Sequence, residues 1–113
     1  MTKTFDFNAV KKRYLTVKLA DDKNTTLFVG TPTKSIMDEI MRLQTDFTAM
    51  NENGSNDEIM TDLYDVCAKI MSRNKAGVKI STEYLENLLD FEDMLLFFNA
   101  YVGFIEEITN AKN

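Results

Sequence analysis

The chain has 113 residues, a net charge of −5 and 44% apolar residues, with one cysteine and no histidine. This length fits one domain, and the apolar content is that of a folded globular protein. The absence of histidine excludes a Cys/His zinc site, a Ser-His-Asp triad and a histidine base. We therefore predict a single domain over residues 1–113 with no catalytic, cofactor-binding or metal-binding residues. Cys67 is expected to be a small buried side chain on a helix.

The charge is unevenly spread along the chain. Residues 1–34 carry seven Lys/Arg and three Asp, whereas residues 35–113 carry six Lys/Arg and fifteen Asp/Glu. Nucleic-acid-binding domains usually carry a basic face across the whole body, so the short basic segment favours a solvated rim. The N-terminus lacks the apolar core of a signal peptide, and the longest apolar run, Met94–Phe98, is far shorter than the ~20 residues of a membrane span. We expect a cytoplasmic protein with neither nucleic acid nor membrane as partner.

Residues 14–30 show the alternation of a β-hairpin. Leu15, Val17 and Leu19 share one face of the first run, and TTLFV forms the second. The intervening Asp-Asp-Lys-Asn supplies turn residues. Pro32 then ends the strand because it cannot donate to a ladder. Residues 1–13 are expected to be a flexible N-terminal segment.

Helical periodicity extends over residues 33–108. Helices are expected at residues 34–50, 55–72, 82–89 and 91–108. The candidate caps are Thr33 or Ser35 (paired with Asp38), Ser55 with Glu58, Ser81, and Asp90 with Asp93. The predicted fold class is α+β, mainly helical, with an N-terminal antiparallel β-hairpin followed by a small bundle of three to four helices.

Residues 72–83 have the length and the glycine position of an EF-hand calcium loop. Gly77 stands at loop position six and Glu83 at position twelve. The positions for acidic ligands hold Ser, Asn and Ala instead, and one Arg and two Lys add positive charge. We predict an ordinary loop without calcium.

The last helix has an apolar face about 180° wide, whereas a surface helix needs little more than ~100°. The side chains expected to face the core are Phe91, Leu95, Phe98, Val102 and Ile105. The other apolar side chains of this face are expected to contact a partner protein. Two of the seven methionines are expected to join them, since methionine suits adaptable binding surfaces. The candidate interface residues are Met37, Met41, Phe97, Tyr101, Phe104 and Ile108. We expect the chain to self-associate through this surface.

Two alternatives stay open for these residues. The methionines also suit gap-filling in a core. The last helix could be the central helix of the bundle, with three neighbouring elements covering its wide apolar face.

Three segments resemble the sequences of a known family: PTK at 32–34, MSRNKAGVKIS at 71–81 and LLDFEDMLLFFNAYVGFI at 88–105. With them, most of the chain, from about residue 10 to 113, resembles the tail assembly chaperones of long-tailed (siphovirus-type) bacteriophages or prophages of Gram-positive bacteria. The resemblance implies a non-enzymatic helper that coats the tape measure protein, recruits tail tube subunits and is absent from the finished virion. It also implies a short form beside a longer frameshifted form, and the ending Ala-Lys-Asn can be encoded with a slippery heptamer.

Two rival functions use the same residues differently. One is a small DNA-associated regulator acting through the basic N-terminal segment, whose DNA affinity would fall steeply with salt. The other is a structural or tail-completion protein, which would be found in purified virus particles.

Overall fold

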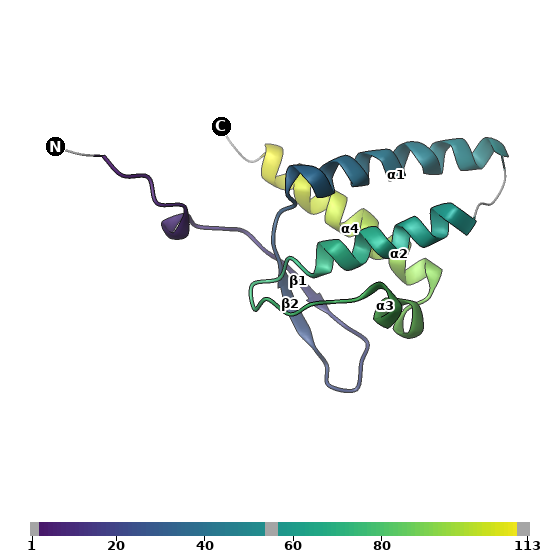
Figure 1. Cartoon of the computed structure of the whole chain (residues 1–113), viewed down its shortest axis with the longest axis horizontal. Coiled ribbons are helices and arrows are strands. Elements are labelled where there is room, and N and C mark those ends of the chain that lie inside the picture. Colours follow the sequence, from purple (N-terminus) through teal and green to yellow (C-terminus); the bar gives the residue numbers. More distant parts are fainter. Residues whose placement is uncertain (1–2, 54–56, 111–113) are drawn as a thin grey trace.

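The computed structural model describes residues 3–53 and 57–110, with the backbone alone for residues 50–53. In chain order the elements are the 3-10 turn η1 (Phe7–Ala9), β1 (Leu15–Lys18), β2 (Thr26–Val29), α1 (Lys34–Asn53), α2 (Asp57–Met71), α3 (Thr82–Leu88) and α4 (Phe91–Asn110). Figure 1 shows the helices gathered on one side of the hairpin, with the N-terminal segment projecting away from them. The predicted fold class, α+β and mainly helical with an N-terminal hairpin, is confirmed.

The hairpin pairs β1 and β2 antiparallel, with Leu15 opposite Val29 and Lys18 opposite Thr26. Its turn is built by the residues that the sequence indicated. The Asp21 carboxylate accepts a hydrogen bond from Thr25 N–H (2.8 Å), and Asn24 adopts a φ of 53°. Asparagine tolerates this left-handed conformation better than most residues, which explains its place at the end of the turn.

The loop between α2 and α3 runs along the outer edge of β2. Gly30 N–H donates to Arg73 O (2.8 Å), and Lys75 N–H donates to Phe28 O (2.9 Å). Val29 and Asn74 form an isolated antiparallel bridge between these bonds. The loop therefore closes one edge of the two-stranded sheet and fastens the hairpin to α2.

Asn74 shapes this loop from within. Its buried amide donates to Met71 O (2.9 Å) and to Val78 O (2.6 Å), and its side-chain oxygen accepts from Val78 N–H (2.9 Å). Gly77 has a φ of 76°, the left-handed region in which glycine is favoured. The 72–83 segment is thus a structural loop held by an asparagine at a position where an EF-hand would place a calcium ligand.

We expect Asn74→Ala to destabilise the fold by about 2–3 kcal/mol, because two carbonyls and one N–H lose their partner. The melting temperature should fall by roughly 10 °C. Thermal unfolding followed by circular dichroism measures this. Lys75→Ala is the matched control, since its side chain is exposed and its backbone bond is retained. An Asn74→Ala melting temperature equal to that of the control would contradict the assignment.

The helix at the centre of the fold is α2, which packs against α1, α3, α4 and β2. Its buried residues are Ile59, Leu63, Tyr64, Val66, Cys67, Ala68, Ile70 and Met71. The last helix is therefore not the central one, although neighbouring elements of its own chain do cover Tyr101 and Phe104 on its apolar face, as the open alternative held. The prediction for Cys67 is confirmed, since this thiol is free and fully buried on α2.

The helix caps match the sequence in part. Ser81 Oγ accepts from Tyr84 N–H (3.1 Å), and Asp90 and Asp93 each accept from the other's backbone N–H (2.8 and 3.1 Å), as predicted. At the start of α1 the cap is Thr33, whose Oγ1 accepts from Ile36 N–H (3.3 Å), so the cap at Ser35 is wrong. The helix also extends to Asn53, beyond the predicted end at residue 50. Ser55 lies outside the described residues.

In the described part of the chain, every helix is too short or too polar to traverse a lipid bilayer.

Candidate protein interface

The structure corrects the predicted partner face of α4. Tyr101 is 0% exposed and Phe104 is 9% exposed, so both are covered by their own chain. Tyr101 O–H donates to Gly30 O (2.7 Å), which ties α4 to the end of β2. The hairpin occupies the side of α4 that we expected a partner to cover. Tyr101 and Phe104 therefore belong to the core, and their assignment to an interface is wrong.

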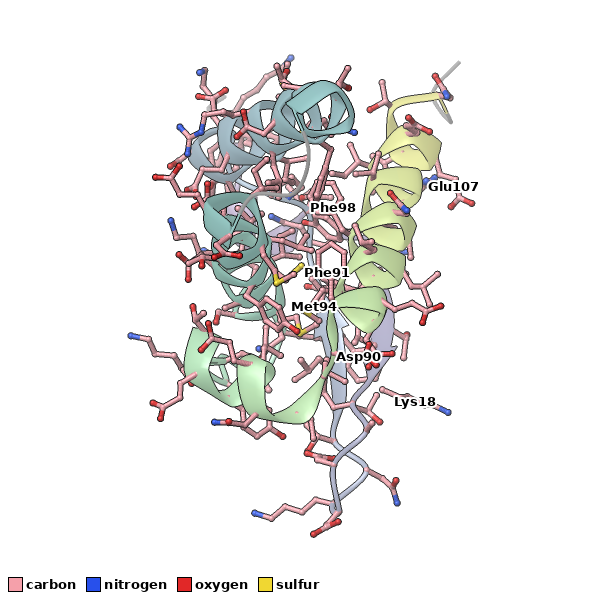
Figure 2. The ribbon with its side chains drawn as sticks, turned by 90° about the vertical axis from the view of Figure 1, so that its right-hand side faces the viewer. Lys18, Asp90, Phe91, Met94, Phe98 and Glu107 are labelled. Atoms are coloured by element: carbon pink, nitrogen blue, oxygen red, sulfur yellow. The ribbon has the colours of Figure 1, made fainter. Side chains whose placement is uncertain are left out.

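The other residues of the α4 prediction lie at the borders of the core. Phe97 and Ile108 are half-buried and pack against the core cluster rather than standing free. Phe98, predicted to face inward, is buried. The rest of the predicted inward set, Phe91, Leu95, Val102 and Ile105, is half-buried against the core. Figure 2 shows Phe91, Met94 and Phe98 pointing from α4 toward the other helices and Glu107 pointing away.

The accessible apolar side chains of the helices lie elsewhere. Met41 on α1 is 54% exposed and Met37, one turn before it, is half-buried, so their assignment to an interface stays a prediction. Leu96 on α4 is 63% exposed and was not predicted as part of any face. These side chains are scattered, so none of them forms a large patch alone.

The aromatic side chains with the highest exposed fractions belong to the N-terminal arm, which we define as residues 3–13. Phe5 is 71% exposed and Phe7 is 76% exposed. Their rings contact each other edge to face, with centroids 4.7 Å apart. The sequence analysis missed them because it treated residues 1–13 as a flexible tail. The signal that identifies them is a pair of phenylalanines within an otherwise polar and basic segment.

A groove of about 370 Å³ lies between β1 and the first half of α4. Its apolar lining includes Leu15, Val17 and Phe97, and Asp93 and Lys18 supply one charge of each sign. We call it the β1–α4 groove. Its volume lies in the range of protein sites that hold an apolar ligand or side chains of a partner.

A second groove, of about 290 Å³, gathers positive charge and is named the basic groove. Lys12 and Arg13 at the end of the arm face Arg73 and Lys75 of the α2–α3 loop across it. Tyr14 also lines this groove, with the Lys75 ammonium 5.7 Å from its ring centroid. Four cations with no carboxylate in the lining favour an anionic partner.

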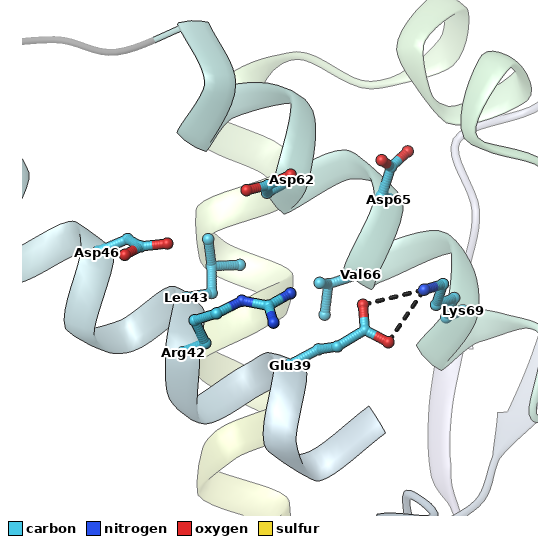
Figure 3. A pocket seen from close by; sticks show the side chains of 8 residues that line it. All are labelled: Glu39, Arg42, Leu43, Asp46, Asp62, Asp65, Val66 and Lys69. Carbon is cyan, nitrogen blue, oxygen red and sulfur yellow. Dashed lines mark hydrogen bonds and ion pairs between the residues drawn. The ribbon is translucent and has the colours of Figure 1, made fainter. Parts of the chain in front are cut away.

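The seam between α1 and α2 is shown in Figure 3. Lys69 Nζ donates to both carboxylate oxygens of Glu39 (3.0 Å each), which links the two helices. Asp46, Asp62 and Asp65 add acidic charge around a space of only about 60 Å³. Small-molecule sites usually have about 300–1,000 Å³, so this seam is too small for a substrate and is bridged by the Lys69–Glu39 ion pair. Within the described residues, no three Asp, Glu or Cys side chains are grouped to hold a metal ion.

Taken together, these features define a mainly helical α+β domain whose accessible aromatic and methionine side chains lie on an arm and on the helix surface. No protein-family model, curated protein or solved structure matches this chain.

Proposed function

We propose that this chain is a non-enzymatic tail assembly chaperone of a long-tailed bacteriophage or prophage. It binds the tape measure protein in the cytoplasm of the bacterial host, keeps it soluble, and helps to recruit tail tube subunits, if necessary through a frameshifted long form. It is not retained in the virion. The observation that carries this proposal is a set of exposed apolar side chains on an acidic body, the most exposed of which are Phe5, Phe7, Met41 and Leu96.

The exposed side chains suit the capture of a long helical client. Phenylalanine and methionine provide large contact area, and methionine adapts to partners of different shape. Contacts of this kind hold an amphipathic helix through a few anchors without requiring one sequence. Many weak contacts along one client add up to strong binding.

The charge of the body supports the same role. The chain has a net charge of −5, and repulsion between like-charged complexes opposes their aggregation. A chaperone that binds an aggregation-prone protein benefits from this repulsion, because each bound copy adds negative charge to the complex.

The identity of the client comes from the sequence resemblance. Its segment at 71–81 forms the loop that closes β2, and its segment at 88–105 includes most of α4. These segments build the core and the hairpin attachment, so the resemblance concerns the fold that presents the exposed side chains.

Co-expression with the long helical protein encoded downstream tests the proposal. We expect the soluble fraction of that protein to rise when this chain is present and the two to co-purify. Met41→Asp should reduce both effects, since it places a charge on an exposed apolar anchor. The melting temperature of the variant should change by no more than about 2–3 °C, as for a surface substitution.

Asn99→Asp is the matched control, because Asn99 is exposed on α4 and the substitution adds one negative charge without removing an apolar side chain. Equal client solubility with and without this chain, and no co-purification at low or moderate salt, would reject the chaperone function.

The runner-up is a small DNA-associated regulator, and one observation favours it. The basic groove places Lys12, Arg13, Arg73 and Lys75 together, which could contact phosphates. Binding of duplex DNA at low salt that weakens steeply as salt rises would support it. Absence of DNA binding at low salt would exclude this function.

A further inference from the structure

The outer edge of β1 is open. Leu19 N–H donates to Thr25 O (2.8 Å), so the alternation of an antiparallel pair turns the backbone groups of Thr16 and Lys18 away from β2. In the described residues the sheet has two strands only, and the α2–α3 loop covers the other edge. An uncovered strand edge is a template for an added strand.

The β1–α4 groove lies directly beside this edge. Leu15 and Val17 of β1 and Phe97 of α4 line it, and each keeps part of its surface exposed. Asp93, in the first turn of α4, and Lys18 of β1 contribute one charge of each sign to the lining. An extended segment with apolar side chains on one face and charges of opposite sign at matching positions fits such a place, since its backbone can pair with β1 while its side chains enter the groove.

The N-terminal arm has this pattern. Phe5 and Phe7 are two residues apart, so both point to the same face once the 3-10 turn η1 (Phe7–Ala9) opens and the arm is extended. Lys3 shares this face, whereas Asp6 lies on the opposite one. The arm carries four basic residues and one acidic residue, against an acidic body. In the free chain both phenylalanine rings are mostly exposed, which is costly in water.

We propose that the N-terminal arm of one copy binds the β1–α4 groove of a second copy as an added antiparallel strand. Phe5 lies opposite Val17, and Phe7 lies opposite Leu15, with both rings in the groove. This register brings Lys3 to the end of the groove that contains Asp93. Asp6 then lies on the outer face, opposite Thr16 and diagonal to Lys18, where unlike charges attract. In this register the two charges of the groove lining, Asp93 and Lys18, each meet an opposite charge of the arm.

The arm is directed away from the groove of its own chain. Lys12, Arg13 and Tyr14 line the basic groove with the α2–α3 loop, on the β2 side of the hairpin. The Tyr14 ring lies close to the Gly30 backbone, which fixes where the arm leaves the body. Residues 9–13 contain no Gly, Pro, Asn or Asp to form a tight turn back toward β1. A second copy therefore receives the arm.

Cysteine crosslinking between two chains tests the contact without any client. In a Cys67→Ala background, an Asp6→Cys chain and a Thr16→Cys chain of different tagged mass are mixed under mild oxidation. Directly opposite residues in an antiparallel pair have Cβ atoms about 4.5–5.5 Å apart, close enough for a disulfide after a small shift. We expect a mixed dimer that a reducing agent separates.

Pairing Asp6→Cys with Glu107→Cys is the control, because Glu107 lies on the outer face of α4 (Figure 2). It should crosslink much less. The proposal is overturned by equal crosslinking of both pairs, by none with Thr16→Cys, or by a double variant that closes only an internal disulfide in a monomer. The last result would place the arm in its own groove.

Sedimentation provides the second measurement. Phe5→Asp with Phe7→Asp should weaken self-association by about tenfold or more, since aromatic anchors dominate interfaces. The melting temperature of the dilute monomer should stay unchanged, because the arm is exposed and does not belong to the core. Unchanged self-association would contradict the proposal. Client solubilisation is measured separately, so loss of the arm contact and loss of the chaperone function give different results.

Discussion

Tyr101→Asp is expected to unfold the chain rather than to separate assembled copies. Tyr101 is fully buried, and its hydroxyl donates to Gly30 O. The substitution removes a ring from the core, leaves a carbonyl without its donor and buries a carboxylate. The cost is about 5 kcal/mol or more, similar to the entire stability of an ordinary domain. Circular dichroism and sedimentation of the purified variant measure the outcome.

Two further variants separate the causes of this effect. Tyr101→Phe keeps the ring and removes only the hydroxyl, so we expect a loss of about 1–2 kcal/mol. Leu96→Asp introduces the same charge on the same helix at an exposed position, and it should cost no more than about 1 kcal/mol. A folded Tyr101→Asp chain with reduced self-association would return Tyr101 to the interface and contradict its place in the core.

Alkaline pH is expected to destabilise the fold from about pH 9 upward. Burial raises the pKa of the Cys67 thiol from 9.0 to about 12, and burial likewise raises the pKa of Tyr101 from 10.0 to about 12, against the lowering effect of Arg73. Between the unfolded and folded pKa values the native state holds the proton more tightly, so stability falls as pH rises. At pH 11 the loss is about 3 kcal/mol for Cys67 and about 1 kcal/mol for Tyr101.

Cys67→Ala isolates the larger of these two contributions. The variant loses some packing at neutral pH, but it has no thiol to ionise, so its stability should begin to fall near pH 10 instead of pH 9. Denaturant unfolding at pH 8 to 11 gives the two curves. Parallel curves for the wild type and the variant over this range would show that Cys67 keeps an ordinary pKa.

The hairpin and the helices could be predicted because their signals are local. Alternation around Leu15 and Val17, turn residues at Asp21 and Asn24, and the reciprocal cap at Asp90 and Asp93 all act over a few residues. Each of these features appears in the structure close to the predicted place.

The assignment of faces could not be predicted because it depends on contacts between distant segments. The sequence shows that α4 has a wide apolar face, but not that the hairpin covers the side containing Tyr101. The two bonds from Asn74 to backbone carbonyls and the attachment of β2 to residues 73–75 are equally invisible to local patterns. As a result, the size of the apolar face was predicted correctly and its outer part was assigned to the wrong neighbour.

The arm illustrates a different limit. Phe5 and Phe7 stand in a segment that lacks the periodicity of a core element, so composition suggested a tail. Only the structure shows that both rings are exposed to solvent and lie outside the core. It also shows an open strand edge on the same molecule. Exposed aromatic residues gain meaning once the surfaces that could receive them are known.

The central claim, that this chain coats a long helical client, is tested most directly by the composition of the purified complex. The tagged chain is co-expressed with the tape measure protein proposed as its client and isolated at moderate salt, and the mass of the complex is measured by light scattering. The account predicts one client molecule with many copies of this chain, and fewer copies when Met41 is replaced by aspartate. Recovery of this chain alone, with the client insoluble and unchanged in amount, would contradict it.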